Sequence, residues 1–262
     1  NFTLLVTSLI QTALKSEKTQ TMRKIICLVT MEPFPFFQAY LGIHAMNNRL
    51  NRLKTKREQR QKRNLRLGGY LIVTDTEETE ANYFNGFVSN IPSKYKDDLQ
   101  IKIFPGKDLK TIIDFAESER NRDVRFRNVW IIFDRDKVKN FDELISDANQ
   151  LDMNVGWSNP CFEIWMSAYF GKMKKCTSSM TCCTNFKKLL ISKTPKKVYC
   201  KSDSDIYEVL AKYGNENKAI DFARKRHSEW LKEYRNPSDM IACSTVYALI
   251  SEIRGKTTQL SV

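Results

Sequence analysis

The residues best suited to chemistry in this chain are carboxylates that follow apolar segments. Asp134 and Asp136 come directly after Val129–Phe133, a run of apolar residues rich in β-branched and aromatic types. Such a run predicts a strand buried on both faces, as in the middle of a parallel sheet. The two acids then lie at the carboxyl end of that strand, where open α/β sheets bind their ligands. An Asp that only caps the next helix is the alternative explanation.

A second apolar segment, Tyr70–Thr74, also ends in a carboxylate. Asp75 follows it directly, and Glu77, Glu78 and Glu80 come next. This segment is predicted to be a strand of the same kind, so Asp75 is expected at the same edge of the sheet as the first pair of acids.

A third acid, Glu163, follows the expected strand Asn154–Trp157. Asn159 is a suitable N-cap and Pro160 a suitable first helical residue, which puts Glu163 in the first turn of a helix. Three strand ends that carry carboxylates can converge on one point. Clustered carboxylate oxygens are the ligands that Mg²⁺ prefers, with water and substrate phosphate completing its shell. The sequence therefore predicts a magnesium site.

The segments that must position these acids alternate between strand and helix patterns. A further strand is expected at Ile101–Phe104, and helices are expected around Glu80–Val88, Leu109–Ala116 and Phe141–Leu151. This order predicts an α/β fold with a mostly parallel sheet, helices on both faces and right-handed crossovers.

The pattern changes beyond residue 170 and predicts a helical C-terminal part. Residues 171–184 are polar and rich in thiols and lysines, and we expect an inserted loop there. Helices are predicted at Asp205–Tyr213, at Asn215–Tyr234 and after Asn236–Ser238, where Gly255 is the expected stop.

The chain is strongly basic, with 43 Lys and Arg against 30 Asp and Glu and a net charge of +13. Its 262 residues, 42% of them apolar, suffice for a core in one large domain or two small ones. The charge favours a polyanionic partner. Nucleic acid fits better than a membrane, because no amphipathic or spanning segment accompanies the charge. Solubility alone is the alternative role for the charge.

Two basic segments are the expected contacts to phosphates. Residues 46–68 are predicted to form a basic lead-in helix, with a solvated or disordered segment as the alternative. A second patch spans residues 187–201 and includes Tyr199, whose ring is a candidate for base stacking or, more commonly, for packing. The residues assigned to nucleic-acid binding are Arg57, Arg60, Arg63, Arg66, Lys196 and Lys197.

The cysteines point to a reducing compartment. Seven cysteines without a regular framework argue against a disulfide scaffold, so we expect a cytoplasmic protein. Cys176, Cys182 and Cys183 cluster, but a zinc site usually pairs a CxxC-type knuckle with a second pair of ligands. Neither His44 nor His227 lies at a convincing spacing from these thiols, and a zinc site is not predicted.

Residues 1–45 differ in character from the rest of the chain and are interpreted as an N-terminal extension. The apolar stretch Phe2–Ile10 lacks a basic region before it and a small-residue cleavage site after it, so it is not predicted to be a signal peptide. It is also too short to cross a bilayer as a helix. No membrane association is expected.

Four motifs in this chain together resemble the RloB family. They are Tyr-Leu-Ile-Val-Thr-Asp-Thr-Glu-Glu-Thr-Glu-Ala-Asn-Tyr-Phe at 70–84, Val-Trp-Ile-Ile-Phe-Asp-Arg-Asp at 129–136, Ser-Asn-Pro-Cys-Phe-Glu-Ile-Trp at 158–165 and Asn-Pro-Ser at 236–238. The resemblance runs from Met46 to the C-terminus and favours Met46 as the natural start. It implies a basic lead-in at 46–68 and an RloB domain at 69–262.

The RloB family is similar to the Toprim-containing nucleases. The resemblance implies a Toprim-like sheet and a nuclease that uses Mg²⁺ or Mn²⁺ to hydrolyse RNA, tRNA included, or DNA in prokaryotic antiphage defence at restriction-modification loci. Asp75 corresponds to the Toprim glutamate, Asp134 and Asp136 to the DxD pair, and Glu80 and Glu163 to acids of the RloB pattern. We therefore expect the three aspartates to bind metal, and Glu80 or Glu163 to hold a water or act as general base.

This chain departs from the family at its first motif. The family usually reads Thr-Glu-Gly-Glu-Lys-Thr-Glu, whereas residues 74–80 read Thr-Asp-Thr-Glu-Glu-Thr-Glu. The acid is one methylene shorter, and the glycine that permits a tight turn is replaced. A second hypothesis is therefore a catalytically impaired nucleic-acid-binding or assembly module that acts with an AAA-type ATPase partner. A response-regulator-like phosphotransfer protein is disfavoured, because it needs a further strand-end Asp and a following lysine that we do not find.

Overall fold

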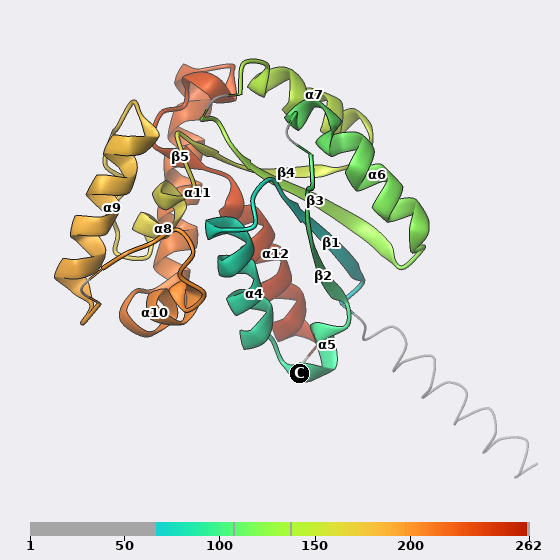
Figure 1. Cartoon of the computed structure of the whole chain (residues 1–262), viewed down its shortest axis with the longest axis horizontal. Helices are drawn as coiled ribbons and strands as arrows, with labels where there is room; N and C mark the ends of the chain where they lie inside the picture. The colour runs from blue at the N-terminus through green and yellow to red at the C-terminus, as the bar shows by residue number, and fades with distance from the viewer. Residues whose placement is uncertain (1–66, 107, 137, 197, 261–262) are drawn as a thin grey trace, which may run out of the picture. The chain divides into compact units, whose positions relative to one another are not determined.

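The fold is built on a five-stranded sheet. The computed structural model describes residues 67–260 except 107, 137 and 197. The strand order is β2-β1-β3-β4-β5 (Figure 1). The strands are β1 (Gly69–Thr74), β2 (Leu99–Ile103), β3 (Phe126–Asp134), β4 (Asn154–Asn159) and β5 (Cys243–Ser244). The first four strands pair in parallel, and β5 pairs antiparallel with β4. The predicted α/β fold with a mostly parallel sheet is confirmed, with β5 as an unpredicted addition.

Helices surround this sheet and make up the C-terminal part, as predicted. They are α4 (Thr79–Asn90), α5 (Ser93–Lys96), α6 (Ile112–Arg122), α7 (Phe141–Gln150), α8 (Glu163–Ala168), α9 (Ser179–Lys193), α10 (Ile206–Tyr213), α11 (Glu216–Glu233) and α12 (Val246–Gln259), with 3₁₀ turns η1 (Leu109–Thr111) and η2 (Pro237–Asp239).

Two local predictions differ from the structure. The loop expected at 171–184 ends early, because Ser178 caps α9 by accepting a hydrogen bond from the backbone N–H of Thr181. Gly255 does not end the last helix. It lies inside α12, whose buried face continues past it to Thr257, so packing outweighs the low helix propensity of glycine.

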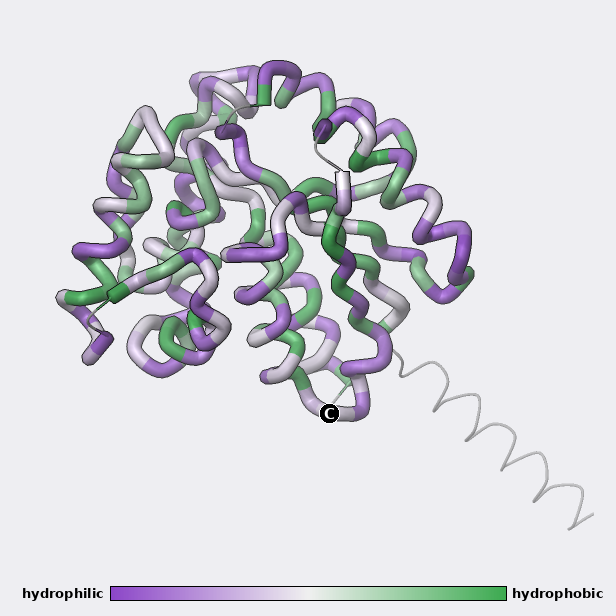
Figure 2. Tube along the Cα trace, viewed as in Figure 1, coloured by the Kyte–Doolittle hydropathy of each residue, from purple (hydrophilic) through white to green (hydrophobic). Residues whose placement is uncertain are grey.

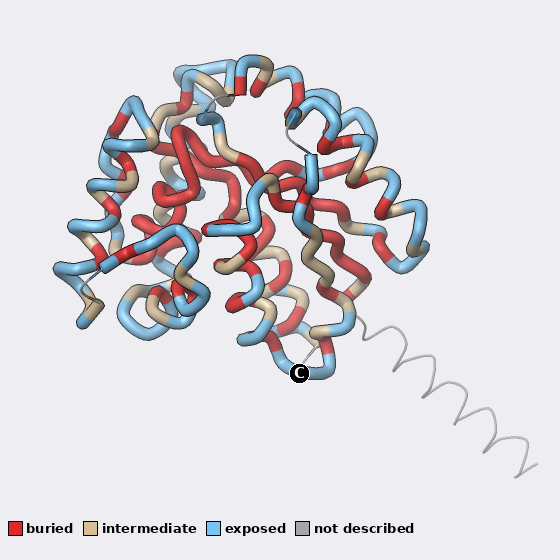
Figure 3. The backbone as a smooth tube through the Cα atoms, viewed as in Figure 1, coloured by how far each residue is buried: buried red, intermediate tan, exposed pale blue. Residues whose placement is uncertain are grey.

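The central strands β1 and β3 are largely buried on both faces, because their apolar side chains alternate between two cores. In β1, Tyr70 and Ile72 point into one core and Leu71 and Val73 into the other, and all four are fully buried. The first core also contains side chains of α4, α8, α9, α10, α11 and α12, and the second contains those of α6 and α7. The strands run through the buried centre between these helical layers (Figures 2 and 3).

The strand order creates a switch point between β1 and β3. From β1 the chain passes through α4, on the first core, to β2 on one side. From β3 it passes through α7, on the second core, to β4 on the other side. Because the two connections diverge to opposite faces, a crevice opens at the carboxyl ends of these strands. Asp75 follows β1 and Asp134 ends β3, so both border this crevice.

Several predictions fall outside the described residues. These are the extension at 1–45, nearly all of the lead-in at 46–68, and the basic residues Arg57, Arg60, Arg63, Arg66 and Lys197. At the end of the lead-in, Leu67 and Gly68 are not helical, and the Leu67 side chain packs in the first core. Among the described helices, none combines the length and the hydropathy that a membrane crossing requires.

Candidate functional site

An acidic cleft of about 510 Å³ lies at the carboxyl ends of β1 and β3. Four of the five predicted catalytic acids line it, namely Asp75, Glu80, Asp134 and Asp136. Its wall also contains residues of η1, of the loop before α7 and of the connection between α9 and α10, including Asp108, Lys110, Lys139, Asn140 and Lys201. The strand-end carboxylates therefore meet in one cavity.

Asp75 lies at the floor of the cleft. Its backbone N–H donates to the carbonyl of Ile132 in β3 at 3.2 Å, which extends the sheet ladder past the end of β1. Its Oδ1 atom is buried and has no hydrogen-bond partner within the described part of the chain. Burial, reinforced by the charge of Glu80, raises the pKa of Asp75 to about 8.

The turn after Asp75 forms without the family's glycine. Thr76 is not among the described non-glycine residues with positive φ, which are Asp152 and Ala242. The Thr74 hydroxyl donates to the Thr76 carbonyl at 2.9 Å and fixes the turn. A side chain is therefore accommodated at this position without backbone strain.

Asp134 lies beside Asp75 in the floor of the cleft, at the end of β3. Its Oδ2 accepts a hydrogen bond from the backbone N–H of Phe162 at 3.0 Å, whereas its Oδ1 is buried and unpartnered among the described atoms. The capping explanation is thus partly right, but the capped turn precedes α8 rather than α7. Burial, together with the charges of Glu80 and Asp75, raises the pKa of Asp134 well above its ordinary value.

Glu80 reaches the cleft from the first turn of α4 and is 4% exposed. The Thr76 hydroxyl donates to its Oε2 at 2.5 Å. Burial raises the pKa of Glu80, and the hydrogen bond from Thr76 opposes that rise. Thr76, which replaces the family's glycine, therefore orients one of the acids of the cleft.

Asp136 differs from Asp134 although the two belong to one DxD motif. The Asp136 side chain is exposed at the rim of the cleft, and its backbone N–H donates to the Pro160 carbonyl at 3.1 Å. It is suited to meeting an incoming ligand, whereas Asp134 is fixed in the floor.

Glu163 lies in the first turn of α8, as predicted, but does not line the cleft. It is 1% exposed, and its Oε1 accepts a hydrogen bond from the Tyr199 hydroxyl at 3.0 Å. Its charge contributes to raising the pKa of both Glu80 and Asp134. Glu163 is therefore an acid behind the cleft rather than in it.

The predicted start of this helix is wrong. Asn159 is not an N-cap. It is the last residue of β4, where it pairs with Cys243 of β5. Pro160 follows it through a cis peptide bond, and α8 begins only at Glu163.

The Asn-Pro-Ser motif at 236–238 connects two elements that carry the site, β4 and α7. The Asn159 amide nitrogen donates to the carbonyl of Ser238 at 2.9 Å and to that of Pro237 at 3.3 Å. The Ser238 backbone N–H and hydroxyl donate to Asp142 of α7 at 2.8 and 2.5 Å. The motif therefore ties the end of β4 to the helix that follows Asp136.

Lys201 and Tyr199 are two site residues that sequence reasoning did not assign. Lys201 lines the cleft, and its pKa is raised because the charges of Glu163, Glu80 and Asp134 outweigh its burial. Tyr199 is 8% exposed, lies edge-on to Phe186 and donates to Glu163, so its ring packs in the protein and is not free to stack on bases. The signal that could have found both residues was their place in the predicted basic patch.

Lys196 is engaged within the chain. Its ammonium lies 3.2 Å from Asp203 and 2.6 Å from Asp205, beside a separate pocket that Lys212 also lines. These ion pairs compete with the phosphate contact predicted for Lys196.

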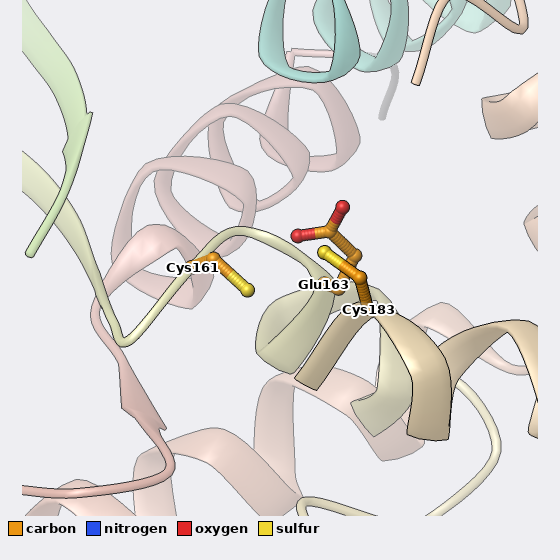
Figure 4. A group of neighbouring side chains, drawn as sticks. All are labelled: Cys161, Glu163 and Cys183. Carbon is orange, nitrogen blue, oxygen red and sulfur yellow. The ribbon is translucent and has the colours of Figure 1, made fainter. Parts of the chain in front are cut away.

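The floor of the cleft fits a hard divalent cation. Asp75 and Asp134 offer one unpartnered buried oxygen each from adjacent strands, and Mg²⁺ or Mn²⁺ prefers such oxygens with waters in the remaining positions. In the described residues, the three-residue group whose ligand atoms all lie within 4.8 Å of one another is Cys161, Glu163 and Cys183, not the cleft acids (Figure 4). The cleft acids do not form such a three-residue group, so waters and substrate oxygens would supply the remaining ligands of an ion held there.

The fold and the site define an α/β protein with an acidic cleft at the switch point of a parallel sheet. A model of the family described as RloB-like protein matches residues 70–253, which is more than half of the chain. The chain therefore belongs to the RloB-like family. The matched segment begins in β1 and contains all five predicted acids and the Asn-Pro-Ser motif. No curated protein and no solved structure matches the chain.

Proposed function

We propose that this protein is a metal-dependent nuclease that hydrolyses phosphodiester bonds of RNA, tRNA included, or of DNA. The observation that carries the proposal is the pair of buried, unpartnered carboxylate oxygens of Asp75 and Asp134 in one cleft. Burying two like charges side by side is costly unless a cation compensates them. Mg²⁺ or Mn²⁺ is the cofactor that suits these oxygens.

The residues of the cleft would have different roles in hydrolysis. Asp75 and Asp134 would hold the ion, with Asp136 at the rim, and a bound ion would supply charge neutralisation at the phosphate and a lowered pKa for water. Glu80, oriented by Thr76, is the candidate general base, because it lines the cleft beside the aspartates and burial raises its pKa and so its affinity for a proton. Glu163, behind the cleft, would raise the pKa values of Glu80 and Asp134 through its charge.

The polyanion is held by positive charge around the cleft. Lys110, Lys139 and Lys201 line the cavity that contains the acids, and the chain as a whole carries a net charge of +13. Cations beside a carboxylate floor let phosphate oxygens approach without net repulsion. We extend the proposal to a cytoplasmic role in prokaryotic antiphage defence, as the family resemblance implies, with an AAA-type ATPase as the candidate protein partner.

The test is cleavage of labelled tRNA, single-stranded DNA and double-stranded DNA with Mg²⁺ or Mn²⁺. Asp134→Ala is expected to lower the rate by about 100-fold or more, because the ion contributes several kcal/mol to the transition state. Asp221→Asn is the matched control: it removes a carboxylate from an exposed site on α11, and we expect it to cleave like the parent.

Two outcomes would overturn the proposal. Equal cleavage rates for Asp134→Ala and the parent would show that the cleft is not the site of hydrolysis. If no substrate is cut although nucleic acid binds and salt weakens the binding, the protein is a nucleic-acid-binding or assembly module instead.

A further inference from the structure

Four thiols lie in the first core, two of them beside Glu163. Cys161, Cys176 and Cys182 are buried and Cys183 is half-buried. Cys161 comes from the connection between β4 and α8, and Cys182 and Cys183 come from the first turns of α9. Distant segments thus bring together cysteines that show no metal-binding spacing in the sequence.

The ligand atoms of three residues face one another. The sulfurs of Cys161 and Cys183 and a carboxylate oxygen of Glu163 all lie within 4.8 Å of one another (Figure 4). Cys176 and Cys182 are buried in the same core as Cys161, so further sulfur lies in this part of the protein.

Packing explains only part of this cluster. Cys176 and Cys182 are small, weakly polar side chains inside an apolar core, where free cysteine is common. Glu163 is different, because a carboxylate that is 1% exposed needs compensation. Tyr199 compensates one oxygen, and Cys183 contacts the carboxylate as well.

We propose that Cys161, Glu163 and Cys183 form a binding site for a thiophilic divalent cation of the Zn²⁺ type, separate from the carboxylate cleft. Two sulfurs and one carboxylate oxygen match the ligand preferences of Zn²⁺, and a water or the Cys182 sulfur can complete a tetrahedron. Zinc lies about 2.3 Å from sulfur, so tetrahedral sulfurs are about 3.8 Å apart and the ligands need to close by about 1 Å at most.

The two sites would select different cations. Mg²⁺ is hard and prefers the all-oxygen floor of Asp75 and Asp134, whereas thiolates favour softer ions. A cation at the thiol site would join α9 to the turn that carries Phe162, whose backbone N–H holds Asp134. The thiol site would thereby stabilise the wall of the cleft without belonging to it.

The test is direct metal binding by the full chain, reduced and stripped of metal. Titration with Co²⁺ in excess Mg²⁺, which occupies the carboxylate cleft, is expected to produce thiolate-to-cobalt charge-transfer absorption that saturates at one ion per chain, and Zn²⁺ is expected to displace the cobalt. Cys183→Ser and Cys161→Ser should each weaken binding roughly tenfold or more. Glu163→Gln should weaken it too while retaining the charge-transfer band, because both thiolates remain.

Cys200→Ser is the matched control, since Cys200 is an exposed thiol outside the three-ligand group, and its titration should match that of the parent. Circular dichroism of each variant shows whether it folds. Cys183 is only half-buried, so Cys183→Ser carries the test if the Cys161 variant does not fold. Absence of the band in the folded parent, or parent-like affinity in folded Cys183→Ser, would overturn the proposal.

Discussion

At the residue scale, the cleft is defined by carboxylates that the fold forces together. Burial raises the pKa values of Asp75, Glu80 and Asp134. The charge of Glu80 also raises the pKa of Asp75, and the charges of Glu80 and Asp75 raise that of Asp134. Without a bound metal ion, protons and the charge of Lys201 compensate these carboxylates. The proton affinity of the cleft is therefore linked to the stability of the fold.

Because the pKa of Asp75 is raised, we expect the stability of the fold to depend on pH in an unusual direction. The Asp75 pKa is 3.8 when unfolded and about 8 in the fold, so the folded state binds the proton more tightly. The free energy of unfolding in a chelator should therefore fall as pH rises from about 4 to about 8. Mg²⁺ binds the deprotonated form, so the stabilisation that it adds should be larger at pH 8 than at pH 6. Thermal melts at these two pH values, with chelator or Mg²⁺, measure both effects.

Asp75→Asn is the control for this prediction, because it removes the titrating group and keeps the shape of the side chain. Its stability in chelator should vary less with pH over the same window, and Mg²⁺ should stabilise it less. A parent-like slope in this variant would assign the pH dependence to other groups.

The acids were predictable from sequence and their supporting residues were not. Strand-end carboxylates can be recognised because an apolar run ends where each begins, as at Asp75 and Asp134. Lys201 and Tyr199 lie in the predicted basic patch, but their place beside the cleft depends on the packing of the α9–α10 connection, which no local pattern predicts. The burial of Glu163 beside thiols could not be predicted from the sequence either, because it depends on how α9 packs.

At the scale of elements, β4 depends on a segment that follows it by more than eighty residues. Thr245, just after β5, accepts a hydrogen bond from the Trp157 N–H at 3.0 Å and donates to the Val155 carbonyl at 3.1 Å through its hydroxyl. Its own backbone N–H donates to the Trp157 carbonyl at 2.9 Å. One residue thus completes the ladder of a strand that leads into the site.

Thr245→Val tests this role. The substitution keeps the size of the side chain but leaves the buried Trp157 N–H without its acceptor, so we expect a loss of about 1–3 kcal/mol in the free energy of unfolding. Urea denaturation monitored by tryptophan fluorescence measures it. Thr245→Ser retains the hydroxyl and should lose less, and an equal loss in both variants would attribute the effect to packing.

The elements themselves were largely predictable, with failures where pairing is long-range. β1 and β3 have clear apolar runs, and helices such as α7 show a regular period. Strand β5 is two residues long and exists only because β4 presents an edge to it. The start of α8 was misplaced for the same reason, since Asn159 is engaged by β5.

At the scale of the whole molecule, the positive charge sets how a polyanion would bind. The net charge of +13 coexists with an acidic cleft, so the attraction must come from outside its floor. The lead-in at 46–68 is the densest basic segment of the sequence and remains the predicted principal contact.

Combined substitution of Arg57, Arg60, Arg63 and Arg66 by Gln should weaken nucleic-acid binding and reduce its dependence on salt. Removing one phosphate contact lowers the slope of log K against log salt by about 0.7–0.9. Fluorescence anisotropy with a labelled oligonucleotide at several salt concentrations measures the slope. Lys196→Gln is the control, because its ammonium is already paired with Asp203 and Asp205, and it should change the slope little. An unchanged slope in the arginine variant would exclude the lead-in from the interface.

The late position of β5 and α12 also has a consequence for how the protein is made. Synthesis proceeds from the N-terminus, so the acids between Asp75 and Glu163 leave the ribosome before Cys243–Ser244 and α12 exist. A growing chain thus carries the reactive groups while the edge of its sheet and one wall of its first core are missing. The sheet and the first core that support the cleft are complete only once β5 and α12 have been made, so the proposed activity toward RNA would await the synthesis of these two elements.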